Sequence, residues 1–298
     1  MITSEDIKTL IPQREPMLMI DKLCKIDYNS ADTKFRVRKN CLFVNDYRHL
    51  DVEGLLENIA QSAATIVGNN ALKENKAVPI GLLGEISKCL FWQMPHVGEV
   101  VRTNISIITE ALGVMLIQSS SYRKNDVLCA STKMKIAAAH NLCNSICKDD
   151  ANISSTVCKD NANILPTVCK DFSKIVSFER SDRQAVFDII LLPECDIYRG
   201  HFPDFPVAPG VFNLRLLREC VEILAGMPMK FFEICKCRFN AFIKMNAAKR
   251  VRLKISYVVV GDAYHLLATL EDFHDNTNYM DFTGILEHDY VAKKKKTI

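Results

Sequence analysis

The sequence lacks the features that mark several large classes of protein. None of its apolar runs is long enough to span a bilayer, and the net charge of +3 is too small to indicate nucleic-acid binding by itself. Residues 1–6 are acidic and lack the basic and apolar segments of a signal peptide. We therefore expect a globular protein that binds no nucleic acid and has no membrane span.

The chain also lacks a recognisable metal-binding pattern, although it contains twelve cysteines. With no secretion signal, these cysteines predict reduced thiols and a cytoplasmic location. Four of them lie in one stretch: Cys143, Cys147, Cys158 and Cys169. Their spacing matches no common zinc site, and residues 147–157 are repeated almost unchanged at 158–168. This favours a solvated linker over a metal site, and we expect no metal or other cofactor.

A length of 298 residues suits two domains of about 150 residues each. In both halves of the chain, a mostly apolar helix is followed by long runs rich in β-forming residues. The expected helices are a short one at 4–10 and the two buried ones at 54–67 and 211–225. The expected strands are 17–26, 34–37, 78–83, 89–93, 100–108, 114–121, 127–138, 174–179, 185–192, 231–242, 251–260, 265–270 and 279–286.

This repeated order predicts two copies of one α+β fold, each an antiparallel sheet wrapped around a central helix. The first domain is expected over residues 1–140 and the second over 172–290. The repetitive linker covers 141–171, and a basic, solvated tail covers 291–298.

A stiff turn precedes the second buried helix. Gly200 and the prolines that follow it fix a rigid, extended backbone, and Pro209 stands where prolines favour the start of a helix. The turn therefore presents His201 beside a helix N-terminus, whose free N–H groups suit a developing negative charge.

Polar residues form one stripe on the first buried helix. Glu53, Glu57, Gln61 and Thr65 are spaced four apart and so share a face. Glu57 is therefore either a group with a chemical role or an ordinary acid on the surface of the helix.

The segments around these residues strongly resemble the hot-dog-fold 3-hydroxyacyl-(acyl carrier protein) dehydratases of fatty-acid synthesis. The second half carries the resemblance through Gly200-His201-Phe202-Pro203, Pro206-Val207 and Pro209-Gly210-Val211. The first half carries it through residues 10–21 (LIPQREPMLMID) and through Glu57-Asn58-Ile59-Ala60-Gln61. The resemblance implies two tandem hot-dog domains that form an internal pseudo-dimer.

Each half departs from the family pattern, which has a histidine in the turn and an acid on the helix fourteen residues later. The second half keeps His201 but has Arg215 at the acid position, whereas the first half keeps Glu57 but lacks the histidine turn. His49, the histidine nearest to Glu57 in the first half, stands in an unrelated context. If the halves pair as the family's subunits do, His201 faces Glu57 in one composite site, and the mirror-related site is inactive.

The resemblance also implies the chemistry of this site. His201 is the base that removes the proton α to a thioester carbonyl, and Glu57 is the acid that protonates the departing β-hydroxyl. The backbone N–H of Gly210 binds the carbonyl oxygen, and the substrate-binding residues include Val211, Phe202 and Gln61. The reaction, the dehydration of a 3-hydroxyacyl chain to a trans-2-enoyl chain, would serve fatty-acid or related polyketide or polyene synthesis.

The implied partner is an acidic acyl carrier protein with a pantetheine-linked substrate, and the pseudo-dimer could form a further homo-oligomer. Candidate contacts for the carrier are Arg48, Arg199, Arg218 and Lys236. Arg215 either contacts substrate phosphate or pairs with Glu219 on its own helix.

Two other functions fit the same sequence. Hot-dog proteins also include acyl thioesterases, and the loss of half of each site fits a non-catalytic acyl-binding or scaffold protein. The distance between His201 and Glu57 tests these alternatives. If the two residues lie on opposite sides of the molecule, neither enzymatic function can use this composite site.

Overall fold

The computed structural model describes residues 2–139, 172–202 and 206–289. The predicted linker, with its four cysteines, and the predicted basic tail lie outside these ranges. No helix in the described ranges is both long enough and apolar enough to cross a bilayer.

The first half contains one long helix and a set of antiparallel strands. Its elements are β1 (Ile2–Thr3), α1 (Ser4–Ile7), β2 (Lys22–Ile26), β3 (Ser30–Arg36), α2 (Val52–Lys73), β4 (Ile80–Phe91), β5 (Val100–Ala111), β6 (Val114–Tyr122), the 3₁₀ turn η1 (Lys124–Asp126) and β7 (Leu128–Ala139).

The second half repeats this plan. Its elements are β8 (Ser173–Arg180), β9 (Gln184–Leu191), α4 (Ile197–Gly200), α5 (Gly210–Ala225), β10 (Met229–Phe239), β11 (Lys249–Val260), β12 (Ala263–Asp272) and β13 (Asn278–His288).

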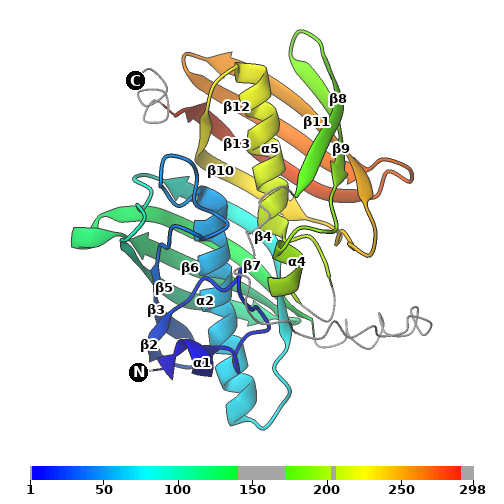
Figure 1. The fold of residues 1–298 in the computed structure, drawn as a ribbon. Coiled ribbons are helices and arrows are strands. Elements are labelled where there is room, and N and C mark those ends of the chain that lie inside the picture. Colours follow the sequence, from blue (N-terminus) through cyan, green and yellow to red (C-terminus); the bar gives the residue numbers. More distant parts are fainter. Residues whose placement is uncertain (1, 140–171, 203–205, 290–298) are drawn as a thin grey trace, which may run out of the picture.

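The thirteen strands in the described ranges form one antiparallel sheet, in the order β1-β2-β3-β5-β6-β7-β4-β10-β13-β12-β11-β9-β8. The halves meet where β4 pairs with β10, with Cys89 opposite Ile234 and Ile86 opposite Cys237. Figure 1 shows α2 and α5 on the same face of this sheet, with their N-termini near the junction of the halves. The molecule is therefore a pair of tandem hot-dog domains related by a pseudo-two-fold axis.

Both long helices are buried because their sequences are apolar around most of the circumference. Leu55, Leu56 and Ile59 of α2 and Leu214 and Leu217 of α5 have no exposed surface. The rings of Phe43 and Phe212, one from each half, pack with centroids 5.3 Å apart. The core thus runs without a break between the two domains.

Three expected strands are arranged differently in the structure. The runs at 78–83 and 89–93 belong to the single strand β4, because two irregularities in its register against β7 absorb the polar residues between them. Of the run at 17–26, only β2 is a strand. Side chains of α2 satisfy the preceding backbone instead: Asn58 Nδ2 donates to the Met19 carbonyl over 2.6 Å, and the Met19 N–H donates to Gln61 Oε1 over 2.8 Å.

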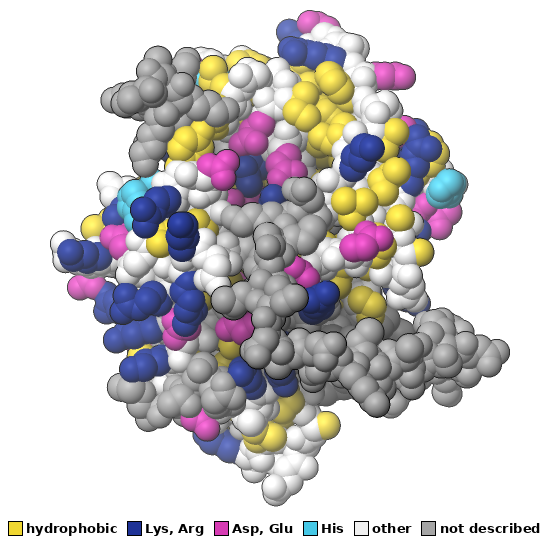
Figure 2. All heavy atoms as spheres, in the orientation of Figure 1, with side chains coloured by type: hydrophobic (Ala, Val, Ile, Leu, Met, Phe, Trp, Pro, Cys, Tyr) yellow, Lys and Arg dark blue, Asp and Glu magenta, His cyan; other side chains and the backbone are white. Residues whose placement is uncertain are grey.

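Basic side chains gather over β2, β3 and β5 at the outer edge of the first half (Figure 2). Lys25, Lys34, Arg36 and Arg102 are exposed there. The small net charge of the chain is therefore unevenly distributed over its surface.

Candidate active site

His201 follows the single helical turn α4, which the sequence did not reveal, and the backbone is extended at His201 and at Pro209, as expected. The His201 N–H donates to the Ile197 carbonyl over 2.9 Å, and the Arg14 N–H donates to the Gly200 carbonyl over 2.9 Å. A Cβ on Gly200 would lie 2.5 Å from the Arg14 oxygen and 2.8 Å from the Met17 nitrogen. Only glycine fits such a close approach, so the histidine turn of the second half rests directly on the first half.

The histidine ring is buried and has a defined tautomer. Nδ1 lies 3.1 Å from the Val207 carbonyl oxygen. A carbonyl oxygen can only accept, so Nδ1–H donates to it and Nε2 keeps a free lone pair. Burial lowers the pKa of His201 to about 4, against the opposing effect of the bond to Val207. The ring is therefore neutral, and hence basic, at neutral pH.

Glu57 lies in the second turn of α2 and is only 5% exposed, so the surface-acid alternative is wrong. Burial raises the pKa of Glu57 to about 7, although a hydrogen bond from Gln61 opposes the shift. Gln61 Nε2 donates to Glu57 Oε1 over 2.8 Å and to the Met17 carbonyl over 2.6 Å. Gln61, which accepts from the Met19 N–H, thus holds the Glu57 carboxyl in place.

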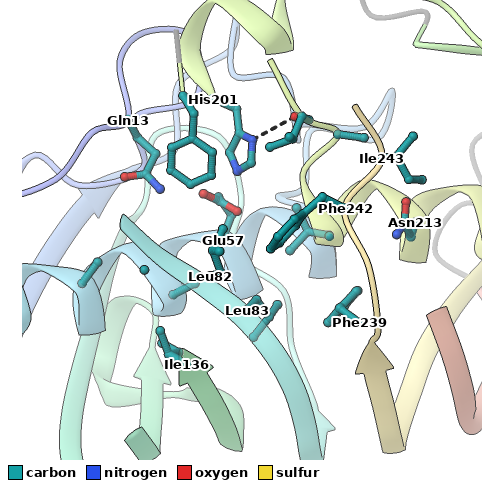
Figure 3. Close-up of a pocket in the computed structure, with 18 of the residues that line it drawn as sticks. Gln13, Glu57, Leu82, Leu83, Ile136, His201, Asn213, Phe239, Phe242 and Ile243 are labelled. Atoms are coloured by element: carbon teal, nitrogen blue, oxygen red, sulfur yellow. Dashed lines mark hydrogen bonds between the residues drawn. The ribbon is translucent and has the colours of Figure 1, made fainter. Parts of the chain in front are cut away.

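The two groups come from different halves and line the same cavity, whose free volume is about 60 Å³. Figure 3 shows the His201 ring and the Glu57 carboxyl facing each other across it. The rest of the wall is mostly apolar, with Leu82, Ile136 and Phe242 among its members. A neutral imidazole thus lies opposite a carboxyl that keeps its proton up to about neutral pH.

Of the other residues predicted to bind substrate, Phe202, Gly210 and Val211 line this cavity, whereas Gln61 supports it from behind Glu57. Gly210 is the first residue of α5, so its N–H lacks an acceptor within the helix. In the described part of the chain, no three His, Cys, Asp or Glu side chains are placed to hold a metal ion.

Arg215 pairs with its own helix, as one of the two readings predicted. Its Nε donates to Glu219 over 2.7 Å, and its guanidinium lies 5.6 Å from the centre of the Phe172 ring. Arg215 stands as far into α5 as Glu57 stands into α2, but it does not line the His201–Glu57 cavity. It holds the second half together locally.

A second cavity, of about 420 Å³, has the mirror-related position. The N-terminal residues of α2, Val52 and Glu53, line it together with Arg218 and Glu222 of α5. In the first cavity the roles are exchanged, since the N-terminus of α5 lines it with Glu57 of α2. We call this second space the mirror cavity. His49 lies there against His96, with ring centroids 3.8 Å apart, far along the chain from the histidine turn.

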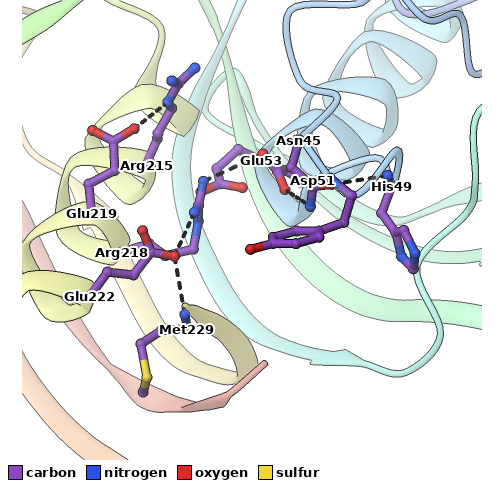
Figure 4. Close-up of polar contacts among 10 residues, drawn as sticks. Asn45, His49, Asp51, Glu53, Arg215, Arg218, Glu219, Glu222 and Met229 are labelled. Atoms are coloured by element: carbon purple, nitrogen blue, oxygen red, sulfur yellow. Dashed lines mark hydrogen bonds and ion pairs between the residues drawn. The ribbon is translucent and has the colours of Figure 1, made fainter. Parts of the chain in front are cut away.

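The mirror cavity contains an ion cluster instead of an acid–base pair (Figure 4). Arg218 contacts Glu53 at 2.9 Å, Glu222 at 3.1 Å and Asp51 at 3.5 Å, and its side chain is only 14% exposed. The prediction that Arg218 contacts a carrier protein is therefore wrong, because its side chain is buried and pairs with three carboxylates. The α5 pair with Glu222 has the i, i+4 spacing that sequence can reveal, whereas the partners on the first half are visible only in the fold.

Sequence reasoning also missed Gln13 and Val207. Gln13 lines the His201–Glu57 cavity and Val207 fixes the His201 ring. Both lie inside motif segments, but spacing gives no sign that a glutamine reaches the cavity or that a carbonyl selects a tautomer.

Two family models match consecutive parts of the chain. The model of the ApeP dehydratase matches residues 5–146, which contain Glu57, and the model of the ApeI dehydratase matches residues 177–263, which contain His201.

Curated relatives are 3-hydroxyacyl-(acyl-carrier-protein) dehydratases named FabZ. The protein of Oceanobacillus iheyensis is 31% identical over 113 residues, which cover 36% of this chain and 79% of that protein. The protein of Halalkalibacterium halodurans is 30% identical over 113 residues, with the same two shares, 36% and 79%.

Solved structures of similar fold extend over most of the chain. The tesB protein of Mycobacterium avium subs paratuberculosis has a TM-score of 0.56 at 8% identity, covering 90% of this chain and 96% of that one. A putative oleoyl thioesterase from Lactobacillus plantarum has a TM-score of 0.56 at 10% identity, covering 87% and 96%. At these identities the likeness concerns the fold alone, and it confirms the tandem hot-dog architecture.

Proposed function

Because the chain belongs to the hot-dog 3-hydroxyacyl-(acyl carrier protein) dehydratase family, with two dehydratase halves in tandem, we propose that it dehydrates 3-hydroxyacyl chains on acyl carrier protein to trans-2-enoyl chains. One composite site per chain carries the reaction, and it serves fatty-acid or related polyketide or polyene synthesis. The observation that supports this most is the pairing of His201 and Glu57, from different halves, across one cavity.

His201 is the base of the proposed reaction. Its Nε2 lone pair takes the proton from the α-carbon, and the Val207 carbonyl stabilises the imidazolium that forms by accepting from Nδ1–H. The electron pair of the broken C–H bond becomes the α,β double bond as the bond to the β-oxygen breaks.

Glu57 is the acid. Because burial raises its pKa to about 7, it keeps its proton up to about neutral pH and gives it to the departing β-oxygen, which leaves as water. The carboxylate then regains a proton and His201 loses one, through solvent, before the next turnover.

Gly210 stabilises the charge that develops as these bonds break. As the α-proton leaves, negative charge develops on the thioester oxygen, and the first N–H of α5 is a preorganised donor for it. One such donor contributes about 3 kcal/mol to lowering the barrier.

The carrier-protein substrate is the finer part of the proposal. Its support is the family and the exposed basic residues Arg48, Arg199 and Lys236. The Arg199 side chain is 72% exposed and lies two positions before His201. Its exposure and its closeness to His201 in the chain support it as a candidate contact for an acidic carrier.

The test combines two single variants. His201→Asn and Glu57→Gln should each lower kcat for 3-hydroxyacyl-carrier dehydration by about 10²- to 10⁴-fold, as followed by enoyl absorbance. His265→Asn and Glu219→Gln, which change a histidine and a glutamate outside the cavity, are the matched controls and should keep activity.

Co-expression of the two inactive variants then tests the composite site. If each chain builds its own site, the mixture stays inactive, whereas recovered activity means that His201 and Glu57 meet between chains. Full activity of either single variant contradicts the proposed site. Release of free thiol without enoyl absorbance by the wild-type chain would replace dehydration with thioester hydrolysis.

A further inference from the structure

Gly81 leaves a slot in the wall of the His201–Glu57 cavity. A Cβ on Gly81 would lie 3.5 Å from Ile136 Cγ2 and 3.7 Å from Ala64 Cβ. These are ordinary contact distances between carbon atoms, so the slot has apolar walls and is wide enough for one methylene group. All three residues line the cavity, and Gly81 and Ala64 are only partly buried, so they keep surface that a ligand can touch.

The slot lies farther along α2 than Glu57. Ala60 and Ala64 follow Glu57 at the i+3 and i+7 positions, so the three side chains share one face of the helix. Ala64 is two turns, about 10 Å, beyond Glu57 along the helix axis. Both alanines line the cavity, as does Gly81 near the start of β4. The wall therefore continues from the Glu57 carboxyl to the slot as an apolar track.

The proposed chemistry sets the direction in which an acyl chain runs. With the thioester oxygen at the Gly210 N–H and the β-oxygen at Glu57, the chain passes from the second half of the molecule toward the first. Asn213 lies in the same turn of α5 as Gly210. Figure 3 shows Asn213 on one side of Glu57 and Ile136 on the other. The carbons beyond C3 therefore point toward the side of the cavity that holds Ile136 and the slot.

The other side of the cavity suits the arm that carries the acyl chain. Phe239, Phe242 and Ile243 line it on the side of Asn213 (Figure 3). Phe242 is 41% exposed, so the cavity reaches the surface beside this ring. A pantetheine arm needs such an opening because it leads out to the carrier, whereas an acyl chain gains most from a track that removes it from water.

We propose that Gly81 is a specificity-determining residue for acyl chain length, an inference that rests on the proposed function. Methylene groups beyond C3 of the substrate occupy the slot that the missing side chain leaves between Ala64 and Ile136. Each methylene that enters is removed from water and strengthens binding about fourfold. A side chain at position 81 would take the place of the substrate there and shorten the chain that the site accepts.

The test measures binding rather than turnover, so that it does not depend on activity. In a His201→Asn background, calorimetry gives the affinities of saturated acyl pantetheine thioesters from butyryl to decanoyl. Gly81→Ala puts a methyl group in the slot at contact distance from both walls, so the chain should fold normally. It should weaken binding of the decanoyl thioester about 10- to 100-fold and that of the butyryl thioester by less than about twofold.

Two further variants separate this role from a general effect of the substitution. Gly84→Ala makes the same change on the same strand but outside the cavity lining, where a Cβ would lie 3.5 Å from the Lys135 carbonyl oxygen. It should leave the dependence of affinity on chain length unchanged. Ile136→Ala removes the carbon that faces the slot, so combining it with Gly81→Ala should recover binding of the decanoyl thioester.

The inference is overturned if Gly81→Ala weakens all chain lengths alike, which would place the pantetheine arm in the slot, or if it weakens none. It is also overturned if Gly84→Ala acts in the same way, or if Ile136→Ala brings no recovery. Failure of the wild-type chain to dehydrate any hydroxyacyl carrier would overturn the proposed function, while the dependence of affinity on chain length still decides the role of Gly81.

Discussion

Glu53 and Glu57 lie one turn apart on the same buried helix, yet they belong to cavities of opposite character. Glu53 is 1% exposed and pairs with the guanidinium of Arg218. Glu57 is 5% exposed and has an uncharged partner, the amide of Gln61. The carboxyl beside the cation binds the two halves together, whereas the one without a cation has a raised pKa and can donate a proton.

The two pseudo-symmetric cavities have different roles: one holds the proposed acid–base pair, and the other holds ion pairs that join the two halves. In the first, burial acts on each group without a strong opposing charge, so His201 is neutral at pH 7 and Glu57 keeps its proton up to about that pH. In the mirror cavity, burial raises the pKa of Asp51 to about 7, while Arg218 opposes the shift. Arg218 therefore holds these carboxyl groups in ion pairs, and the cluster stabilises the fold.

The largest expected effect separates the two glutamates. Glu57→Gln should lower kcat by about 10³-fold because the acid is lost, with little change in the melting temperature. Glu53→Gln should do the reverse, since it breaks a buried pair but leaves the cavity with His201 intact. Kinetics and thermal unfolding of both variants check this, and similar profiles for the two would remove the distinction between the cavities.

Arg218→Met should come next. Removing the cation leaves three carboxylates around a buried space, so the free energy of unfolding should fall by about 3–5 kcal/mol. Arg215→Met, on the same helix, breaks a partly exposed pair and should cost less than about 1 kcal/mol. Denaturant unfolding measures both, and equal losses would show that the mirror cluster contributes no special cohesion.

The pH dependence of activity tests the neutral pair. Glu57 must be protonated to act as an acid and its pKa is about 7, so kcat/KM should fall tenfold per unit as pH rises above about 7. His201 must be unprotonated and its pKa is about 4, so activity should also fall below about pH 4. A profile that rises through pH 7 would instead require an ionised Glu57.

The smallest expected effect is that of restoring the missing acid. Arg215→Glu gives α5 the carboxyl of the family pattern, but no histidine turn precedes α2. It should therefore change kcat by less than about twofold and should restore no activity to His201→Asn. Any recovery in that double variant would mean that His49 or His96 can serve as a base.

The tandem fold could be predicted because helix periodicity marks α2 and α5 and the same order of elements occurs twice. The His201–Glu57 pairing could be predicted only through the resemblance to the dehydratase family, against whose pattern each half lacks one of the two groups. The single strand β4 could not be predicted, because its polar middle reads as a turn until pairing with β7 and β10 supplies its hydrogen bonds.

The contacts between the halves were also invisible in the sequence. Arg218 looked like a surface cation, since only the fold brings it to Asp51 and Glu53, more than 160 positions away along the chain. In the sequence Gly200 was interpreted only as part of a rigid turn, whereas its lack of a Cβ also makes room for the backbone of Arg14 and Met17. Side-chain environments that combine distant segments depend on packing, which spacing does not encode.

The seam between β4 and β10 joins two halves that are encoded once each. In a dimer of identical subunits every substitution appears in both sites, so neither site can lose a residue while the other keeps it. In this chain the halves are inherited together but change separately. Covalent fusion thus allows one half to lose its histidine and the other its acid, and selection can act on each cavity alone.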